Sequence, residues 1–262
     1  MYILLIGKFL ENNMKNFKNS ILGLLIFSLS AHALPVWELY QIEVDEASKA
    51  PNILKATNEF LSSSTGKKFE GGLFLNQQVF NGREEATHDF AVLHKDLAAM
   101  EKWHAIAAPS MDWAKFIKSL NNNSDAYAEF LYTSIAFWGN RNANVGVWEF
   151  VPFRLNDDAT PADVYAITDK FLNSDVFKKY NIPVFLNSQN YGGIDWTTHA
   201  YTVGHPSMAA MQSFQEDVGV SAAWAEYLSE MNKIVTFRGN SLVRGIGAWG
   251  DMTLADFANE IN

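Results

Sequence analysis

The sequence predicts an α+β fold in which two tandem β-α-β-β-α-β units join their antiparallel sheets into one barrel within a single chain. Three observations support this prediction: an internal duplication, the same order of strand and helix patterns in both halves, and a composition that can form a core. Of the 262 residues, 48% are hydrophobic and 19% are charged, which suits a globular chain rather than a disordered one. The sequence contains no cysteine, which excludes disulfides, thiolate zinc sites and cysteine nucleophiles.

The duplication is visible when the sequence is laid over itself with a shift of 111 residues and no gap. The matching segments include Val-Trp-Glu (36–38 and 147–149), Phe-Leu-Asn (74–76 and 185–187) and Trp-Gly (138–139 and 249–250). Matches that keep one register over the whole length indicate a repeated structural unit. We therefore expect a first repeat over residues 34–140 and a second over residues 141–262.

Each repeat presents the same elements in the same order. The elements predicted for the first are a strand at 36–44, a helix at 50–65, strands at 71–80 and 87–94, a helix at about 96–120 and a strand at 130–138. Asn81-Gly82 joins the two middle strands and is a hairpin signal. This order is the split βαβ motif, which leaves one sheet face open. Packing the two sheets together buries the open face of both.

These features resemble the dimeric α/β-barrel superfamily, in which two ferredoxin-like units join their sheets into a barrel with the helices outside. The resemblance covers about residues 35–251 and rests on element order and duplication. It implies two tandem ferredoxin-like units in one intramolecular α/β barrel, for which a monomer is sufficient. The superfamily includes cofactor-independent monooxygenases, haem-degrading enzymes, chlorite-dismutase-like haem proteins and small stress-response proteins. It therefore implies a shape more firmly than a reaction.

The first 33 residues have the pattern of a signal peptide. A short basic segment from Met14 precedes an apolar stretch, and Ala-His-Ala at residues 31–33 fits a signal-peptidase site. We expect Met14 to be the true start and the mature protein to be periplasmic or secreted. The apolar stretch is too short to span a bilayer comfortably, and no second hydrophobic run of membrane length follows it, so we expect no membrane association once it is removed.

The charge argues against polyanionic partners. The whole chain carries a formal charge of −9. Removal of residues 1–33 would leave 17 basic and 28 acidic residues, a net charge of −11. A chain this acidic is a poor partner for nucleic acid or anionic lipid.

Polar and aromatic residues alternate along the hairpin strands, so residues of one parity share a face. The even positions of the first hairpin are Phe74, Asn76, Gln78 and Phe80 on one strand and His88, Phe90, Val92 and His94 on the other. Their counterparts in the second repeat are Phe185, Asn187, Gln189, Tyr191, His199, Tyr201, Val203 and His205. We expect hairpin closure to join these sets on one face, with His88 beside Gln78 or Phe80. The second hairpin would place His199 beside Gln189 or Tyr191.

Two interpretations of this face stay open. In one, the polar groups satisfy one another in a buried hydrogen-bond network. In the other, they line a site in which His88 and His199 transfer protons or donate hydrogen bonds, while Asn76 and Asn187 orient a ligand. The expected ligand contacts are then Asn76, Gln78, Phe90, His94, Asn187, Gln189, Tyr201 and His205.

Glu38 and Glu149, each next to a tryptophan at the start of a strand, are further catalytic candidates. A buried glutamate there could act as a general base with a raised pKa, and a purely structural role is the alternative. No metal site is expected, because histidines six residues apart on one strand lie about 20 Å apart. His104, on the second predicted helix, corresponds to Gln215 and is interpreted as an ordinary surface residue.

Three functions therefore stay open. The first is an exported barrel that binds a small, partly apolar molecule and, by analogy with the monooxygenases, transforms it oxidatively. The second is a non-enzymatic exported barrel with a fully packed interior and a structural or stress-related role. The third is a haem-binding barrel, which needs an axial histidine; the other two need no cofactor. Whether the protein is an enzyme is left open at this point.

Overall fold

The structure is a computed structural model that describes residues 33–82, 84–192, 197–237 and 239–261. All structural statements below concern the compact unit Ala33–Asn262. The predicted signal peptide and the predicted start at Met14 lie outside the described residues. Within those residues, no helix combines the length and apolarity needed to cross a membrane.

The element order confirms the two predicted repeats of an α+β fold. The first half contains β1 (Val36–Glu43), η3 (Ala47–Lys49), α2 (Ala50–Leu61), η4 (Gly66–Lys68), β2 (Gly72–Phe80), β3 (His88–His94), α3 (Leu97–Ala107), α4 (Met111–Asn121) and β4 (Asp125–Trp138). The second contains β5 (Val147–Leu155), α5 (Pro161–Leu172), α6 (Asp175–Lys178), β6 (Val184–Gly192), β7 (His199–His205), α7 (Met208–Gly219), α8 (Ala222–Ile234), β8 (Val235–Phe237), β9 (Ser241–Gly250) and α9 (Leu254–Asn259).

One predicted helix is two helices. The helix expected over residues 96–120 divides into α3 and α4 on either side of Pro109. Proline has no backbone N–H and disfavours helical geometry in the residue before it. The new helix starts at once, because the Ser110 side chain accepts a hydrogen bond from the Trp113 backbone N–H as an N-cap.

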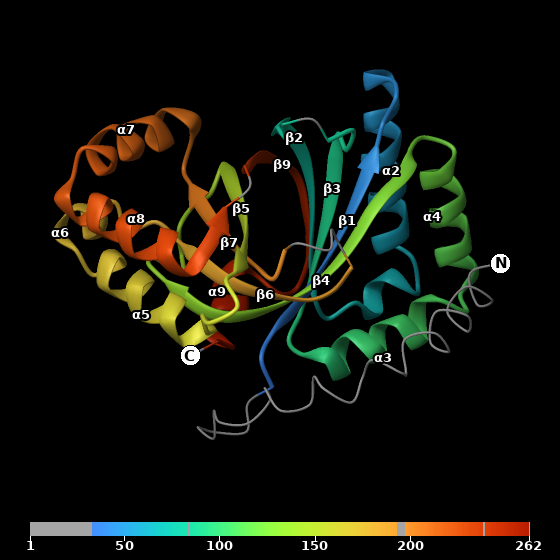
Figure 1. The fold of residues 1–262 in the computed structure, drawn as a ribbon. Coiled ribbons are helices and arrows are strands. Elements are labelled where there is room, and N and C mark those ends of the chain that lie inside the picture. Colours follow the sequence, from blue (N-terminus) through green and yellow to red (C-terminus); the bar gives the residue numbers. More distant parts are fainter. Residues whose placement is uncertain (1–32, 83, 193–196, 238, 262) are drawn as a thin grey trace. The chain divides into compact units, whose positions relative to one another are not determined.

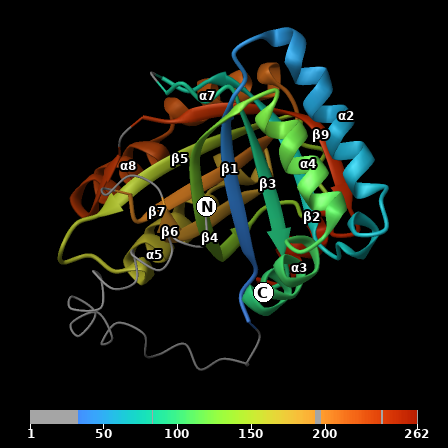
Figure 2. The ribbon, with the colours of Figure 1, turned by 90° about the vertical axis from the view of Figure 1, so that its right-hand side faces the viewer.

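Eight strands form one closed antiparallel barrel, in the order β1-β3-β2-β9-β5-β7-β6-β4 and back to β1. Each half supplies four neighbouring strands, and the halves meet at two seams, β2–β9 and β4–β6. Each seam joins the last strand of one repeat to the second strand of the other. In Figure 1, the helices of the two halves lie on opposite sides of the barrel. Figure 2 looks onto the first half, where α2 and α4 lie along the outside of β1 and β3.

Buried hydrophobic residues form three separate cores. One core packs the helices of the first repeat on the outer face of its strands, and a second does the same in the second repeat. The third contains Trp37, Tyr132 and Phe185 from strands of both halves, together with Phe257 of α9. The barrel interior is thus built jointly by both repeats and is closed in part by the C-terminal helix.

The register of the first hairpin corrects the predicted polar face. β2 pairs with β3 so that Gln77 lies opposite His88 and Asn76 opposite Asp89. Even positions of β2 therefore share a face with odd positions of β3, because a change of register by one residue turns every side chain to the other face. The reason lies in the loop, which is longer than a two-residue turn. The Asn81 side chain donates hydrogen bonds to backbone carbonyls further along this loop. The second hairpin has the equivalent register, with Ser188 opposite His199.

Candidate functional site

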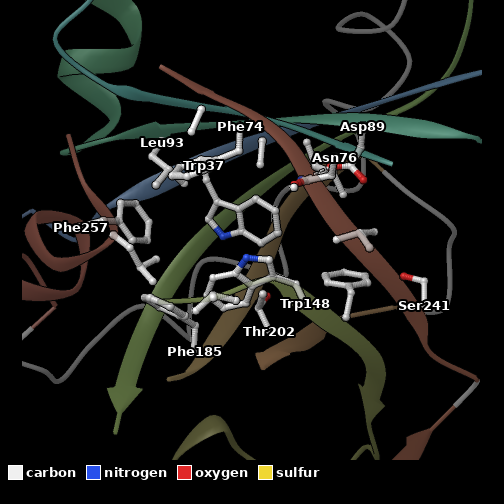
Figure 3. A pocket seen from close by; sticks show the side chains of 18 of the residues that line it. Trp37, Phe74, Asn76, Asp89, Leu93, Trp148, Phe185, Thr202, Ser241 and Phe257 are labelled. Atoms are coloured by element: carbon white, nitrogen blue, oxygen red, sulfur yellow. Dashed lines mark hydrogen bonds between the residues drawn. The ribbon is translucent and has the colours of Figure 1, made fainter. Parts of the chain in front are cut away.

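The barrel interior holds a cavity of about 440 Å³. This volume is within the range of sites for small organic ligands. Its walls come from both repeats and are mainly apolar, with six aromatic residues among the lining: Trp37, Phe74, Trp148, Phe150, Phe185 and Phe257. Figure 3 shows the two indole rings facing each other across this space. The cavity contradicts the alternative of a fully packed interior.

One wall of the cavity carries a buried carboxyl group with two amide partners. Asn76 Nδ2 donates to Asp89 Oδ1 over 2.7 Å, and Gln78 Nε2 donates to Asp89 Oδ2 over 2.8 Å. β2 supplies both amides and β3 the carboxyl, and their side chains meet because these positions share the inner face. Asp89 is only 2% exposed. The three residues, which we name the Asp89 cluster, form a polar patch in a cavity whose lining is mostly apolar.

Burial raises the pKa of Asp89 to about 7, although the hydrogen bonds from Asn76 and Gln78 oppose this rise. Among the described residues that line the cavity, Asp89 alone has an ionisable side chain. No lysine, arginine or histidine in that lining stabilises the carboxylate. A carboxyl group that titrates near neutral pH can accept a proton from a bound molecule and release it again.

The equivalent place in the second repeat is a closed hydrogen-bond network. Asn187 Oδ1 accepts from the Trp37 indole N–H over 3.2 Å and from Ser134 Oγ over 2.7 Å. Its amide nitrogen donates to Thr202 Oγ1 over 3.0 Å and to the Ala200 carbonyl. Asn187 is fully buried. Its hydrogen-bonding groups are thus occupied by the protein itself.

The two repeats differ at two positions near these asparagines, and the differences leave polar groups free in the first repeat but not in the second. Ala200 stands where the first repeat has Asp89, and Gly245 stands where it has Ser134. In addition, Gln78 Oε1 is buried without a hydrogen-bond partner in the described structure. The Asp89 cluster therefore keeps unused acceptor capacity that its counterpart lacks.

Of the residues predicted as a site, three line the cavity: Asn76, Gln78 and Asn187. The others do not contribute to the cavity lining. Phe90 belongs to the helix-side core of the first repeat and Tyr201 to that of the second. Gln189 accepts from the Tyr132 hydroxyl and donates to the Gly192 carbonyl within the second hairpin.

Glu38 and His94 lie on the outer face of the sheet, against the helices. His94 Nε2 is 2.8 Å from Glu38 Oε1, His104 Nε2 is 3.0 Å from Glu38 Oε2, and Tyr40 donates to Glu38 as well. Burial raises the pKa of Glu38, but the hydrogen bonds from His104, His94 and Tyr40 outweigh burial and hold this pKa at about 2. The same carboxylate raises the pKa of His104. A glutamate held this strongly in its charged form is a poor proton acceptor.

The second repeat keeps the pair but not the whole cluster. His205 Nε2 lies 3.1 Å from Glu149 Oε2, and Gln215 replaces His104. Val151 replaces Tyr40. The glutamate–histidine pairs therefore tie the start of β1 and β5 to the end of β3 and β7 in both halves.

His88 and His199 also face the helices and are neutral near pH 7. Each ring Nδ1 lies within 3.0 Å of the hydroxyl of the preceding threonine. Burial lowers the pKa of His88, and it lowers that of His199 to about 4. His199 also stacks on Phe153 in the core. These contacts place both histidines in the hydrophobic packing outside the barrel cavity.

Sequence reasoning missed Asp89 and Trp148 as lining residues. His104 is exposed at the surface, as expected, but its contact with Glu38 was not predicted. One signal could have identified Asp89. On β3, the even positions are kept between the repeats because they form the helix-side core. The odd positions differ, as at Asp89 and Ala200, because they face the cavity.

The residues of the cavity do not fit haem. An axial ligand is usually histidine, cysteine, methionine or tyrosine, and none of these is among the described lining residues. No lysine or arginine there could pair with the propionates. His94 lines a second, smaller cleft of about 160 Å³, but its Nε2 is hydrogen-bonded to Glu38.

The fold is that of the dimeric α/β-barrel proteins, with both units in one chain. A candidate monooxygenase of Fusobacterium nucleatum superposes with a TM-score of 0.58 at 12% identity, covering 84% of this chain and 95% of its own. An anthrone oxidase-like protein gives 0.55 at 9% identity, with 84% and 95% covered. A haem-binding protein of Thermus thermophilus gives 0.51 at 9% identity, with 82% and 92% covered. No family model and no curated relative matches the sequence.

Proposed function

We propose that the barrel binds a small, flat, largely apolar molecule with one weakly acidic C–H or O–H, and that Asp89 accepts its proton. The observation that carries this proposal is a carboxyl group with a pKa of about 7 in the wall of a mostly apolar cavity that contains several aromatic side chains. A general base works best when its pKa lies near the working pH. The aromatic walls would bind the ring system, and the Asp89 cluster would orient the acidic group.

An oxidative reaction is compatible with this chemistry. A carbanion or enolate formed in the cavity can react with dioxygen as the oxidant. For an anthrone, the methylene carbon loses two hydrogens and gains one oxygen atom as a carbonyl, and the second oxygen atom leaves with these hydrogens as water. The similarity in fold to an anthrone oxidase-like protein and to a candidate monooxygenase supports this step. The residues of this chain would contribute proton removal and a mostly apolar surrounding for the reacting carbon.

Anthrone is a suitable probe, because deuterium exchange at its methylene group reports proton removal without oxygen. Under anaerobic conditions the wild-type protein should accelerate this exchange, and Asp89→Asn should lose most of the acceleration. Asp158→Asn, which removes an exposed carboxyl group, serves as the control and should behave as wild type. Equal exchange by wild type and Asp89→Asn, or no acceleration above buffer, would contradict the proposed base.

Haem is the second candidate ligand, since a haem-binding protein shares the fold. The cavity residues argue against it, and we expect no Soret band after haem is added to the purified protein. A Soret band that disappears in His94→Ala would instead place haem outside the barrel.

We also propose that the mature protein acts outside the cytoplasm, on the basis of the signal-peptide pattern at residues 1–33. Mass spectrometry of the mature protein should give an N-terminus at or near Leu34. An intact N-terminus on the active form would contradict export.

A further inference from the structure

Trp37 and Trp148 occupy equivalent positions in the two repeats, and both line the cavity. Their indole N–H groups have different roles. The N–H of Trp37 donates to Asn187, as described above. The N–H of Trp148 has no hydrogen-bond partner among the described residues. Figure 3 shows the Trp148 ring pointing into the cavity, towards Trp37.

The difference lies in the surroundings of the asparagine oxygen. By repeat symmetry, Trp148 should donate to the side-chain oxygen of Asn76. Asn76 directs its amide nitrogen to Asp89 on β3, much as Asn187 directs its own to β7, so the two amides are oriented alike. Gly245, however, replaces the serine whose hydroxyl holds the equivalent oxygen of Asn187. The first repeat thus lacks the hydroxyl that completes this network in the second, and the Trp148 N–H is left facing the cavity.

An indole N–H can donate a hydrogen bond but cannot accept one. An N–H that faces a cavity and has no partner in the protein can donate to an acceptor that a ligand brings. The cavity therefore presents a carboxyl acceptor at Asp89 and a neutral donor at Trp148. A molecule that carries both an acidic hydrogen and a carbonyl oxygen complements this pair.

We infer that the Trp148 indole N–H binds the carbonyl oxygen of the ligand and stabilises the negative charge that develops there. When Asp89 takes the proton, the C–H bond breaks and its electron pair forms a carbon–carbon double bond. The carbonyl electrons then move to oxygen, giving an enolate held by the Trp148 N–H. A fixed donor aimed at developing charge stabilises a transition state more than the ground state. This inference rests on the proposed function for the proton transfer, but the contact to the carbonyl oxygen does not require it.

The contact can be measured by comparing two probes, anthrone and 9,10-dihydroanthracene, which share a ring system and differ in the carbonyl oxygen. Equilibrium dialysis without oxygen gives the ratio of their affinities. Trp148→Phe should lower the preference for anthrone about 3- to 10-fold, the value of one neutral hydrogen bond. Trp37→Phe is the matched control: it makes the same change in ring size, but its N–H is already used, so the preference should stay within about twofold of wild type.

Nuclear magnetic resonance of the wild-type protein tests the same contact if Trp148→Phe does not fold. The indole N–H signal of Trp148 should move downfield when anthrone is added and move less with dihydroanthracene. The Trp37 signal should respond equally to both probes. An unchanged preference in folded Trp148→Phe, or equal responses of the Trp148 signal, would overturn the inference.

These results also separate this inference from the proposed function. Asp89→Asn should keep the preference for anthrone while losing the acceleration of deuterium exchange. If Trp148→Phe loses the preference but Asp89→Asn exchanges as wild type does, the carbonyl contact is supported and the proposed base is wrong. If only Asp89→Asn has its expected effect, the base is supported and the role of Trp148 is wrong.

Discussion

Replacing Asp89 by asparagine should stabilise the protein at alkaline pH. The carboxyl group is buried without a positive partner in the cavity, and the pKa of about 7 means that ionisation is disfavoured in the folded state. Asparagine has nearly the same shape and cannot ionise. Gln78 Oε1, which is buried without a partner, can accept from the new amide once the Gln78 side-chain amide turns over. Asp89→Asn therefore resembles the protonated form of the wild type.

The magnitude follows from the pKa shift. The pKa of Asp89 rises from 3.8 to about 7 on folding. A shift of about three pKa units corresponds to about 4 kcal/mol. Because the folded-state pKa is raised, the stability is fully present below pH 4 and is lost as the pH rises towards 7. Asp89→Asn should match the wild type at pH 4 and exceed its free energy of unfolding by about 2–4 kcal/mol at pH 8.

Urea unfolding of both proteins at several pH values between 4 and 9 measures this difference. Subtraction of the two curves removes contributions from other groups, such as His199 and Glu38, which titrate in both proteins. Parallel curves would refute the reasoning, because they would mean that Asp89 titrates alike in the folded and unfolded chain. If Asp89→Asn instead lost stability relative to wild type between pH 4 and pH 8, the charged form of Asp89 would be the one that the fold stabilises.

Other variants test the remaining assignments. Asn187→Ala should cost about 3 kcal/mol or more in urea unfolding, because it leaves several buried groups unpaired, whereas Asn76→Ala should cost about 1 kcal/mol. Glu38→Gln should cost about 3 kcal/mol at pH 7, since the pKa of Glu38 falls from 4.5 to about 2 on folding; this cost should shrink as the pH falls through that interval. Gly245→Ser should leave the melting temperature nearly unchanged, because its Cβ would lie 3.8 Å from Asn76 Oδ1. Its hydroxyl should hold Asn76 as Ser134 holds Asn187, and equilibrium dialysis should show a several-fold weaker affinity for anthrone.

The barrel could be predicted from the sequence, because an internal duplication implies two units with the same topology. A match kept at one spacing, such as Trp37 with Trp148, implies equivalent units, and two sheets with an open face have few ways to bury it. The candidate site could be predicted only in part. Asn76 and Gln78, expected to contact a ligand, line the cavity, but their neighbours on β3 were assigned to the wrong face.

The error has a single physical origin. Strand parity is decided by the number of residues in the hairpin loop, and Asn81 closes that loop with side-chain hydrogen bonds. A turn signal gives the place of a hairpin but not always its register. The pKa of Asp89 could not be predicted either, because it depends on which charges are absent from a cavity built by both halves.

The joining of both halves in one chain also bears on how such a site can arise. In a barrel made from two identical subunits, every substitution appears twice, on opposite sides of the two-fold axis. An aspartate introduced at position 89 would then place two carboxylates in one small cavity, where their repulsion would oppose folding. Fusion removes this constraint, since Ala200 can remain while Asp89 changes. Because the two halves belong to one chain, their sequences can differ. One half can then carry the reactive groups while the other keeps the residues that stabilise the barrel.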